Sequence, residues 1–132
     1  MSVRDLRFSI DEPVERGGTN TGPTPTDTAL AALVACTNVI GHKCAKKHGV
    51  DIGNLTINAR CEFDRRGVTL EEAIDVPFTK IDLQIQCNGE ATQIQLDALA
   101  KEVAEYCPLS KLFRQAGTEL NDEWKAKDPV ET

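Results

Sequence analysis

Hydrophobic and polar residues alternate along three stretches of the chain, the pattern of β-strands with one buried face. These stretches are residues 3–14, 54–64 and 74–87, and the third closes at Asn88-Gly89, a turn-forming pair. A fourth strand is predicted at residues 118–125. The apolar positions are Leu6, Phe8 and Ile10, then Leu55, Ile57, Ala59 and Cys61, and finally Ile81, Leu83, Ile85 and Cys87.

A long helix is predicted from Pro25 to about His48. Thr24 suits the N-cap, Pro25 suits the first helical position, and Asp27 places a negative charge at the positive helix end. Gly49 follows a basic last turn and ends the helix. The preceding residues, 16–25, are rich in turn formers. Because they join a strand to a well-marked helix start, we expect an ordered loop.

The front half of this helix, Ala29–Ala35, is apolar on every side. A helix that is hydrophobic all round is normally enclosed by protein. In so small a chain, this indicates either that a sheet wraps the helix or that a second subunit covers it.

A second amphipathic helix is predicted at residues 92–106, with apolar residues at spacings of three and four. Cys107-Pro108 interrupts it, and residues 109–115 suit a further short helix that ends before Gly117. Strand, helix, strands, helices and strand in this order predict an α+β fold, in one domain covering residues 1–132.

The chain of 132 residues carries a net charge of −6 and lacks the clustered Lys and Arg that a phosphate backbone requires. We therefore expect no nucleic-acid partner. The first eight residues hold charges where a signal peptide needs an apolar core. The longest apolar run, Ala29–Cys36, is far short of the ~20 residues that span a bilayer. A cytoplasmic protein without a membrane partner is the expectation.

The five cysteines are an odd number in a chain without a secretory signal, which favours reactive or buried thiols over a disulfide framework. Cys107 precedes Pro108 and suits the N-cap of the short helix, where unpaired N–H groups favour a thiolate; it could equally be only a small capping residue. Cys36, in an Ala/Leu-rich helix, has the pattern of a small buried hydrophobe. Cys44 lies among polar residues and is predicted to be exposed and incidental. Cys61 and Cys87 are predicted to fill the core.

A metal site is the competing explanation for so many thiols. Structural zinc sites pair their ligands at spacings of two to four residues, and the nearest such pair is His42 with Cys44. No CxxC, glycine-rich phosphate loop or HExxH motif is present. We therefore expect neither a metal nor another cofactor.

Two distant segments together resemble the OsmC/Ohr family. The first is residues 17–27, Gly-Gly-Thr-Asn-Thr-Gly-Pro-Thr-Pro-Thr-Asp, with Cys36 eleven residues after Pro25. The second is residues 106–111, Tyr-Cys-Pro-Leu-Ser-Lys, which is similar to the Cys-Pro-x-Ser signature of that family. The resemblance runs from about Phe8 to the C-terminus.

This resemblance implies an OsmC-like intertwined homodimer, with antiparallel sheets wrapped around two central helices. It also implies a thiol-dependent peroxidase for organic hydroperoxides, in which Cys36 attacks the peroxide and Cys107 resolves the product as a disulfide. An external dithiol would then reduce that disulfide.

The chain departs from the family pattern at the residues that hold the attacking thiolate. Active members usually carry a glutamate directly after the proline and an arginine in an N-terminal hairpin. Here Thr26 occupies the glutamate position, Asp27 follows it, and the chain is expected to lack that hairpin. Arg4, Arg7 and Arg16 are the nearest arginines. The alternative function is therefore an OsmC-like dimer that binds a small apolar ligand without efficient peroxidase turnover.

Overall fold

A computed structural model of the chain describes residues 1–127, and residues 128–132 lie outside the described part. The described residues divide into two compact units, Met1–Leu33 and the residues from Val34 onward. The boundary falls inside helix α1, Pro25–His48. The single domain expected for residues 1–132 stays a prediction.

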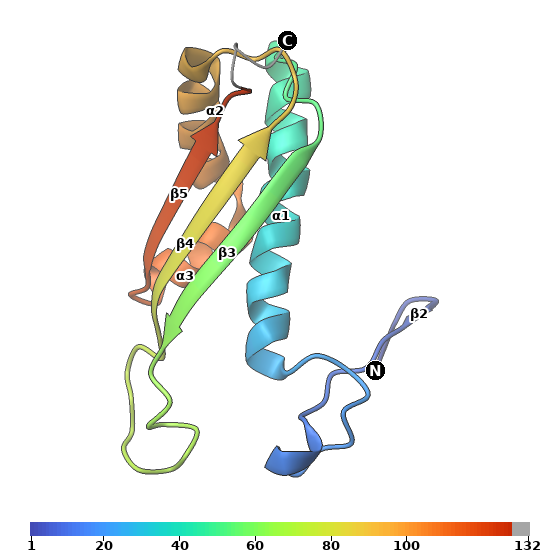
Figure 1. Cartoon of the computed structure of the whole chain (residues 1–132), viewed down its shortest axis with the longest axis vertical. Helices are drawn as coiled ribbons and strands as arrows, with labels where there is room; N and C mark the ends of the chain where they lie inside the picture. The colour runs from blue at the N-terminus through green and yellow to red at the C-terminus, as the bar shows by residue number, and fades with distance from the viewer. Residues whose placement is uncertain (128–132) are drawn as a thin grey trace. The chain divides into compact units, whose positions relative to one another are not determined.

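The larger unit is built on a three-stranded sheet in the order β3-β4-β5 (Figure 1). Its strands are β3 (Leu55–Phe63), β4 (Phe78–Cys87) and β5 (Glu119–Lys125), close to the predicted ranges. β3 and β4 are antiparallel, whereas β4 and β5 are parallel. The expectation of wholly antiparallel sheets is therefore wrong for this sheet. The helical crossover between β4 and β5 returns the chain to the starting end of β4, which makes the two strands parallel.

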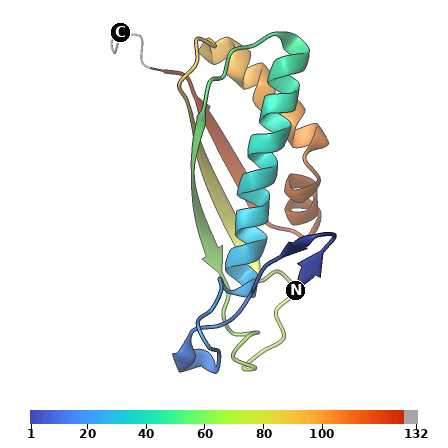
Figure 2. The same ribbon diagram turned by 90° about the vertical axis from the view of Figure 1, so that its right-hand side faces the viewer.

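Helices cover one face of this sheet (Figure 2). After β4 come α2 (Gln93–Tyr106) and α3 (Pro108–Gln115), and α1 from Val34 onward lies on the same side. The core forms where the alternating β4 face meets the apolar stripe of α2, as the pattern predicts. Each fully buried Ile or Leu there contributes roughly 1.5–3 kcal/mol. The buried side chains of β4 and α2 are Ile81, Leu83, Ile85, Cys87, Leu96, Leu99 and Val103.

The helix ends follow their local sequence signals. At the start of α1, the Asp27 N–H donates to the Thr24 hydroxyl over 3.1 Å, which confirms the predicted N-cap. At its end, Gly49 takes a φ of 65°, and Val50 N–H donates to the Ala45 carbonyl over 2.9 Å. This left-handed glycine and the backward hydrogen bond form a Schellman motif. In α2, Thr92 closes a capping box.

The N-terminal unit differs from its prediction. Instead of one strand over residues 3–14, the chain forms a hairpin of β1 (Ser2–Val3) and β2 (Leu6–Arg7), followed by a single turn of 3₁₀ helix, η1, at Val14–Arg16. Arg4 has a φ of 54° in the hairpin turn. The polar pair between Val3 and Leu6 breaks the alternation and allows the chain to reverse there. This short hairpin carries Arg4 and Arg7, and the expected lack of the family's arginine-bearing hairpin stays a prediction.

The front half of α1 is not enclosed within one chain. Ala31, Ala32 and Ala35 are exposed, and Val39 keeps 48% of its surface accessible. The prediction that a sheet of the same chain wraps this helix is therefore wrong. Coverage by a second subunit stays a prediction.

By length and composition α1 also meets the criteria for a membrane-crossing helix, with a mean hydropathy of 1.2 over its most apolar 18 residues. Core helices of soluble proteins meet the same criteria. In the larger unit, α1 buries Thr37, Gly41, Cys44 and Ala45, which share one face of the helix.

Gly41 is the point where α1 approaches the sheet most closely. A Cβ atom placed there would lie 2.8 Å from Cη2 of Trp124, which is itself 3% exposed on β5. The indole fills the space that any larger residue at position 41 would need. The pair therefore sets the separation between α1 and β5.

We expect Gly41→Ala to destabilise the protein by about 1–2 kcal/mol, because overpacking costs more than the gain of about 1 kcal/mol in helix propensity. Urea unfolding measures the change. In a Trp124→Phe background, which removes the clashing atom, the same substitution should be neutral or stabilising. An equal loss in both backgrounds would contradict the assigned contact.

Candidate functional site: a pair of thiols

The structure brings together two cysteines that are far apart in the sequence. Cys36 lies on α1 and is half-buried, whereas Cys107 lies at the junction of α2 and α3 and is 0% exposed. The Cys36 side chain is close enough to Cys107 to act on the pKa of its thiol, and both cysteines are free thiols. Neighbouring thiols can join in a disulfide where their Cα atoms lie within about 7 Å of each other.

Cys107 is held by hydrogen bonds on several sides. It caps α3, as predicted, and its Sγ accepts the N–H of Ser110 over 3.4 Å. Its own N–H donates to the Val103 carbonyl at the end of α2, over 2.8 Å, and its carbonyl accepts the N–H of Lys111 over 3.0 Å. One residue thus ends one helix and begins the next, which fixes the position of its sulfur.

The protonation of Cys107 differs from the expectation of a helix-stabilised thiolate. Burial raises the pKa of the Cys107 thiol above its ordinary value. The N–H of Ser110 acts in the opposite direction, and the neighbouring Cys36 side chain adds to the rise. Desolvation therefore outweighs capping, and Cys107 remains a thiol at neutral pH.

The other three cysteines lie apart from this pair. Cys44 is buried at 5% exposure, so the prediction of an exposed residue is wrong: its polar neighbours in sequence occupy the other side of α1. Burial raises its pKa, and the nearby Glu102 raises it further. Cys87 fills the core as predicted, and burial raises its pKa to about 11. Cys61 is half-buried on β3.

The expected thiolate-activating residues all belong to the N-terminal unit. The Thr26 hydroxyl lies 3.3 Å from that of Thr24, in the cap of α1, and Asp27 contributes its N–H to the same cap. Arg16 pairs with Glu12 over 3.3 Å. Arg7 is exposed in β2.

The sequence analysis missed Asp11, which organises the loop before α1. Its carboxylate accepts hydrogen bonds from the N–H groups of Thr19 (3.0 Å), Thr21 (3.1 Å) and Glu12 (2.8 Å), and from both threonine hydroxyls. These donors, the Thr19 hydroxyl first, hold the pKa of Asp11 well below its usual range. An acid ahead of a Thr-Asn-Thr run was the available signal. The loop is ordered, as predicted.

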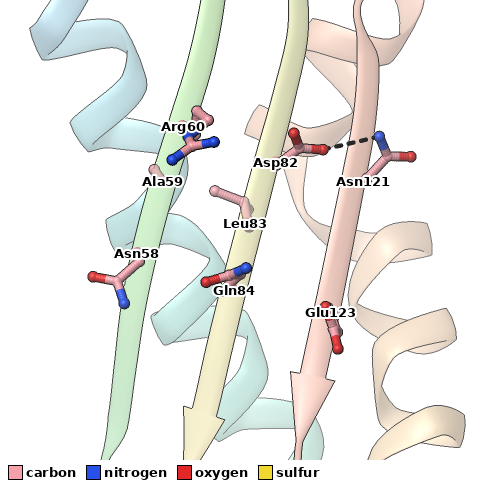
Figure 3. A pocket seen from close by; sticks show the side chains of 8 residues that line it. All are labelled: Asn58, Ala59, Arg60, Asp82, Leu83, Gln84, Asn121 and Glu123. Carbon is pink, nitrogen blue, oxygen red and sulfur yellow. Dashed lines mark hydrogen bonds between the residues drawn. The ribbon is translucent and has the colours of Figure 1, made fainter.

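Metal binding and a hollow on the sheet are two further features that bear on the site. Within residues 1–127, no group of three or more His, Cys, Asp or Glu side chains is placed to hold a metal. A hollow of about 360 Å³ lies on the sheet face away from the helices (Figure 3). Its lining is largely polar, with Asp82 and Asn121 hydrogen-bonded over 3.0 Å. The thiols lie on the opposite, helical side.

Comparison with known proteins agrees with the fold. The family model described as OsmC-like protein matches residues 18–121. An OsmC-like protein from Mycoplasma pneumoniae has a similar structure, with a TM-score of 0.70 at 16% identity over 89% of this chain and 79% of that one. No curated protein matches the sequence significantly.

Two further similar structures bear functional names. One is an organic hydroperoxide resistance protein OsmC from Legionella pneumophila, with a TM-score of 0.65 at 17% identity over 94% of this chain and 83% of that one. The other is the organic hydroperoxide resistance protein OhrB of Bacillus subtilis, with a TM-score of 0.55 at 20% identity over 80% and 73%. At these identities, the similarity shows the fold.

We expect the loop before α1 to loosen in acid. Because the folded pKa of Asp11 is depressed, its carboxylate stabilises the loop fully above the unfolded-chain pKa, near 3.8, and progressively less as the pH falls below that value. Hydrogen exchange of the Thr19 and Thr21 amides should therefore be faster in Asp11→Ala at neutral pH. Glu15→Ala, an acid in the same loop, is the control. Unchanged protection in Asp11→Ala would refute the assignment.

Proposed function

Because this chain belongs to the OsmC-like protein family, we propose that it is a thiol-dependent peroxidase that reduces organic hydroperoxides. The observation that supports the proposal is the proximity of Cys36 to Cys107, two cysteines that are far apart in the sequence. Two neighbouring thiols, one of them partly accessible, are the minimum that a dithiol–disulfide cycle requires.

The different burial of the two thiols supports different roles. Cys36 is partly accessible, so a peroxide can reach its sulfur. Cys107 is fully buried and its pKa is raised, which suits a thiol that keeps its proton until the partner sulfur has been oxidised. We therefore assign the attacking role to Cys36 and the resolving role to Cys107.

The reaction then proceeds in three balanced steps. The Cys36 thiolate attacks the terminal peroxide oxygen, the O–O bond breaks, and the alkoxide takes up a proton and leaves as an alcohol. This leaves a sulfenic acid on Cys36. The Cys107 sulfur attacks the Cys36 sulfur, and the hydroxyl group leaves as water with the Cys107 proton. An external dithiol finally returns two electrons and two protons and restores both thiols.

Activation of Cys36 and assembly of the protein complete the proposal. The residues proposed to activate the Cys36 thiolate are Asp27, Thr26, Arg16 and Arg7. The functional form is a cytoplasmic homodimer, in which the exposed apolar face of α1 lies against a second copy. An exposed strip of alanines allows two helices to approach closely, which supports this arrangement.

A second candidate function has one observation in its favour. The uncharged Thr26 side chain, where active family members carry glutamate, is engaged in the cap of α1 and supplies no charge to a thiolate. A dimer that binds a small apolar ligand without efficient turnover would tolerate this substitution.

We expect the reduced protein to consume cumene hydroperoxide and to form a Cys36–Cys107 disulfide, identified by mass spectrometry of non-reduced peptides. Cys36→Ser should reduce peroxide consumption to the background rate, because it removes the nucleophile. Cys107→Ser should allow one turnover and leave Cys36 as a sulfenic acid. Cys61→Ser, which removes a thiol outside the pair, is the matched control.

Equal peroxide consumption by Cys36→Ser and the unmodified protein would refute the peroxidase proposal. Tight binding of an apolar ligand together with no peroxide consumption would instead favour the second candidate.

A further inference from the structure

One side chain of α3 is linked to the thiol pair through two hydrogen bonds. Nε of Arg114 donates to Oγ of Ser110 over 3.1 Å, and the Ser110 N–H donates to Sγ of Cys107 over 3.4 Å. We propose that Arg114 is a positioning residue, which acts through Ser110 to hold the Cys107 sulfur where it can join Cys36. This inference rests on the proposed dithiol–disulfide cycle.

The burial of the three residues suits this role. Ser110 is 5% exposed and Cys107 is fully buried, whereas Arg114 reaches them from the surface. Within residues 1–127, no carboxylate lies within ion-pair distance of Arg114. The hydrogen bond to Ser110 is therefore the interaction that holds the Arg114 side chain in place. If the Arg114 side chain is removed, the buried Ser110 hydroxyl loses its charged hydrogen-bond partner. Folded proteins rarely leave a buried polar group without a partner.

The short length of α3 explains why this link matters. A helix of eight residues is too short to be stable by itself, and its first N–H groups have no partners within the helix. Phe113 anchors the second turn against Phe78, with ring centroids 5.2 Å apart. In the first turn the capping acceptor is a sulfur, which is a weak acceptor. The bond between Arg114 and Ser110 ties this weakly capped turn to the anchored one.

The two chemical steps depend differently on this link. Attack of the Cys36 sulfur on a peroxide does not require a fixed Cys107. Condensation of the Cys36 sulfenic acid with Cys107 does, because the entering sulfur must lie in line with the S–O bond that breaks. A displacement of about 1 Å can slow such a step by up to roughly a hundredfold. Loss of Arg114 should therefore slow the second step and spare the first.

The test is Arg114→Met, which keeps the aliphatic stem and removes the donor. After one equivalent of cumene hydroperoxide, we expect peroxide loss at the unmodified rate, disulfide formation slowed roughly tenfold or more, and a Cys36 sulfenic acid that dimedone traps and mass spectrometry detects. Arg114→Lys, which restores a donor, should recover part of the disulfide rate. Ser110→Ala should reproduce the defect, and combining it with Arg114→Met should add little more.

Lys111→Met is the matched control, because it removes a positive charge from the same helix and leaves the Ser110 contact in place. We expect it to form the disulfide at the unmodified rate. An equal defect in Lys111→Met would show that net charge, rather than the Ser110 contact, governs the step, and would overturn the inference. Equal slowing of both steps in Arg114→Met would overturn it too, because a general loss of structure has that effect.

Diamide separates this inference from the proposed function, since it forms the same disulfide without any peroxide: the Cys36 sulfur adds to the N=N bond, Cys107 attacks the Cys36 sulfur, and the reduced hydrazine leaves. Slower disulfide formation in Arg114→Met with this oxidant supports the positioning role even if the unmodified protein fails to consume peroxide. Equal rates of disulfide formation with this oxidant in Arg114→Met and the unmodified protein would overturn the positioning role.

Discussion

The contact of Gly41 with Trp124 determines how α1 lies on the sheet, and the candidate site depends on it. Cys36 lies on α1 less than two turns before Gly41, while Cys107 lies at the junction of α2 and α3, which pack against β5. The indole of Trp124 extends from that same strand to Gly41. β5 thus contacts both the helix that carries Cys36 and the two helices that meet at Cys107. The packing of these helices on one strand therefore determines how the two thiols are placed.

Opposing effects at Cys107 show why a helix N-terminus alone does not make a thiolate. Capping N–H groups lower the pKa of the thiol, but the residue is fully buried and the neighbouring Cys36 side chain raises that pKa further. Desolvation of the charged form is the larger effect. Cys107 is therefore a buried thiol that keeps its proton, whereas Cys36 is partly accessible. The two thiols of the pair thus differ in their access to oxidants.

The sequence predicted those parts of the fold whose signals are local. The alternation in β3 and β4, the stripe of α2 and the caps at Thr24 and Cys107 all depend on residues within one turn or one strand. The predictions failed where contacts between residues far apart in the sequence determine the structure. The burial of Cys44 depends on the packing of α1, and the parallel pairing of β5 depends on the path of the crossover. Family resemblance, rather than pattern, linked Cys36 to Cys107, and the role of Asp11 depends on the path of the loop that brings Thr19 and Thr21 to its carboxylate.

The parallel pairing of β4 and β5 also has a consequence for the order of folding. Cys107 lies inside the crossover that joins these strands, so its position is set only when β5 has docked beside β4. Closing so long a loop is slow compared with forming a local helix or hairpin. Until then Cys107 has no fixed position relative to Cys36. Nascent chains should therefore be most vulnerable to mispaired disulfides during this interval. Oxidants that do not harm the folded protein would then trap such misfolded chains before Cys36 and Cys107 have come together.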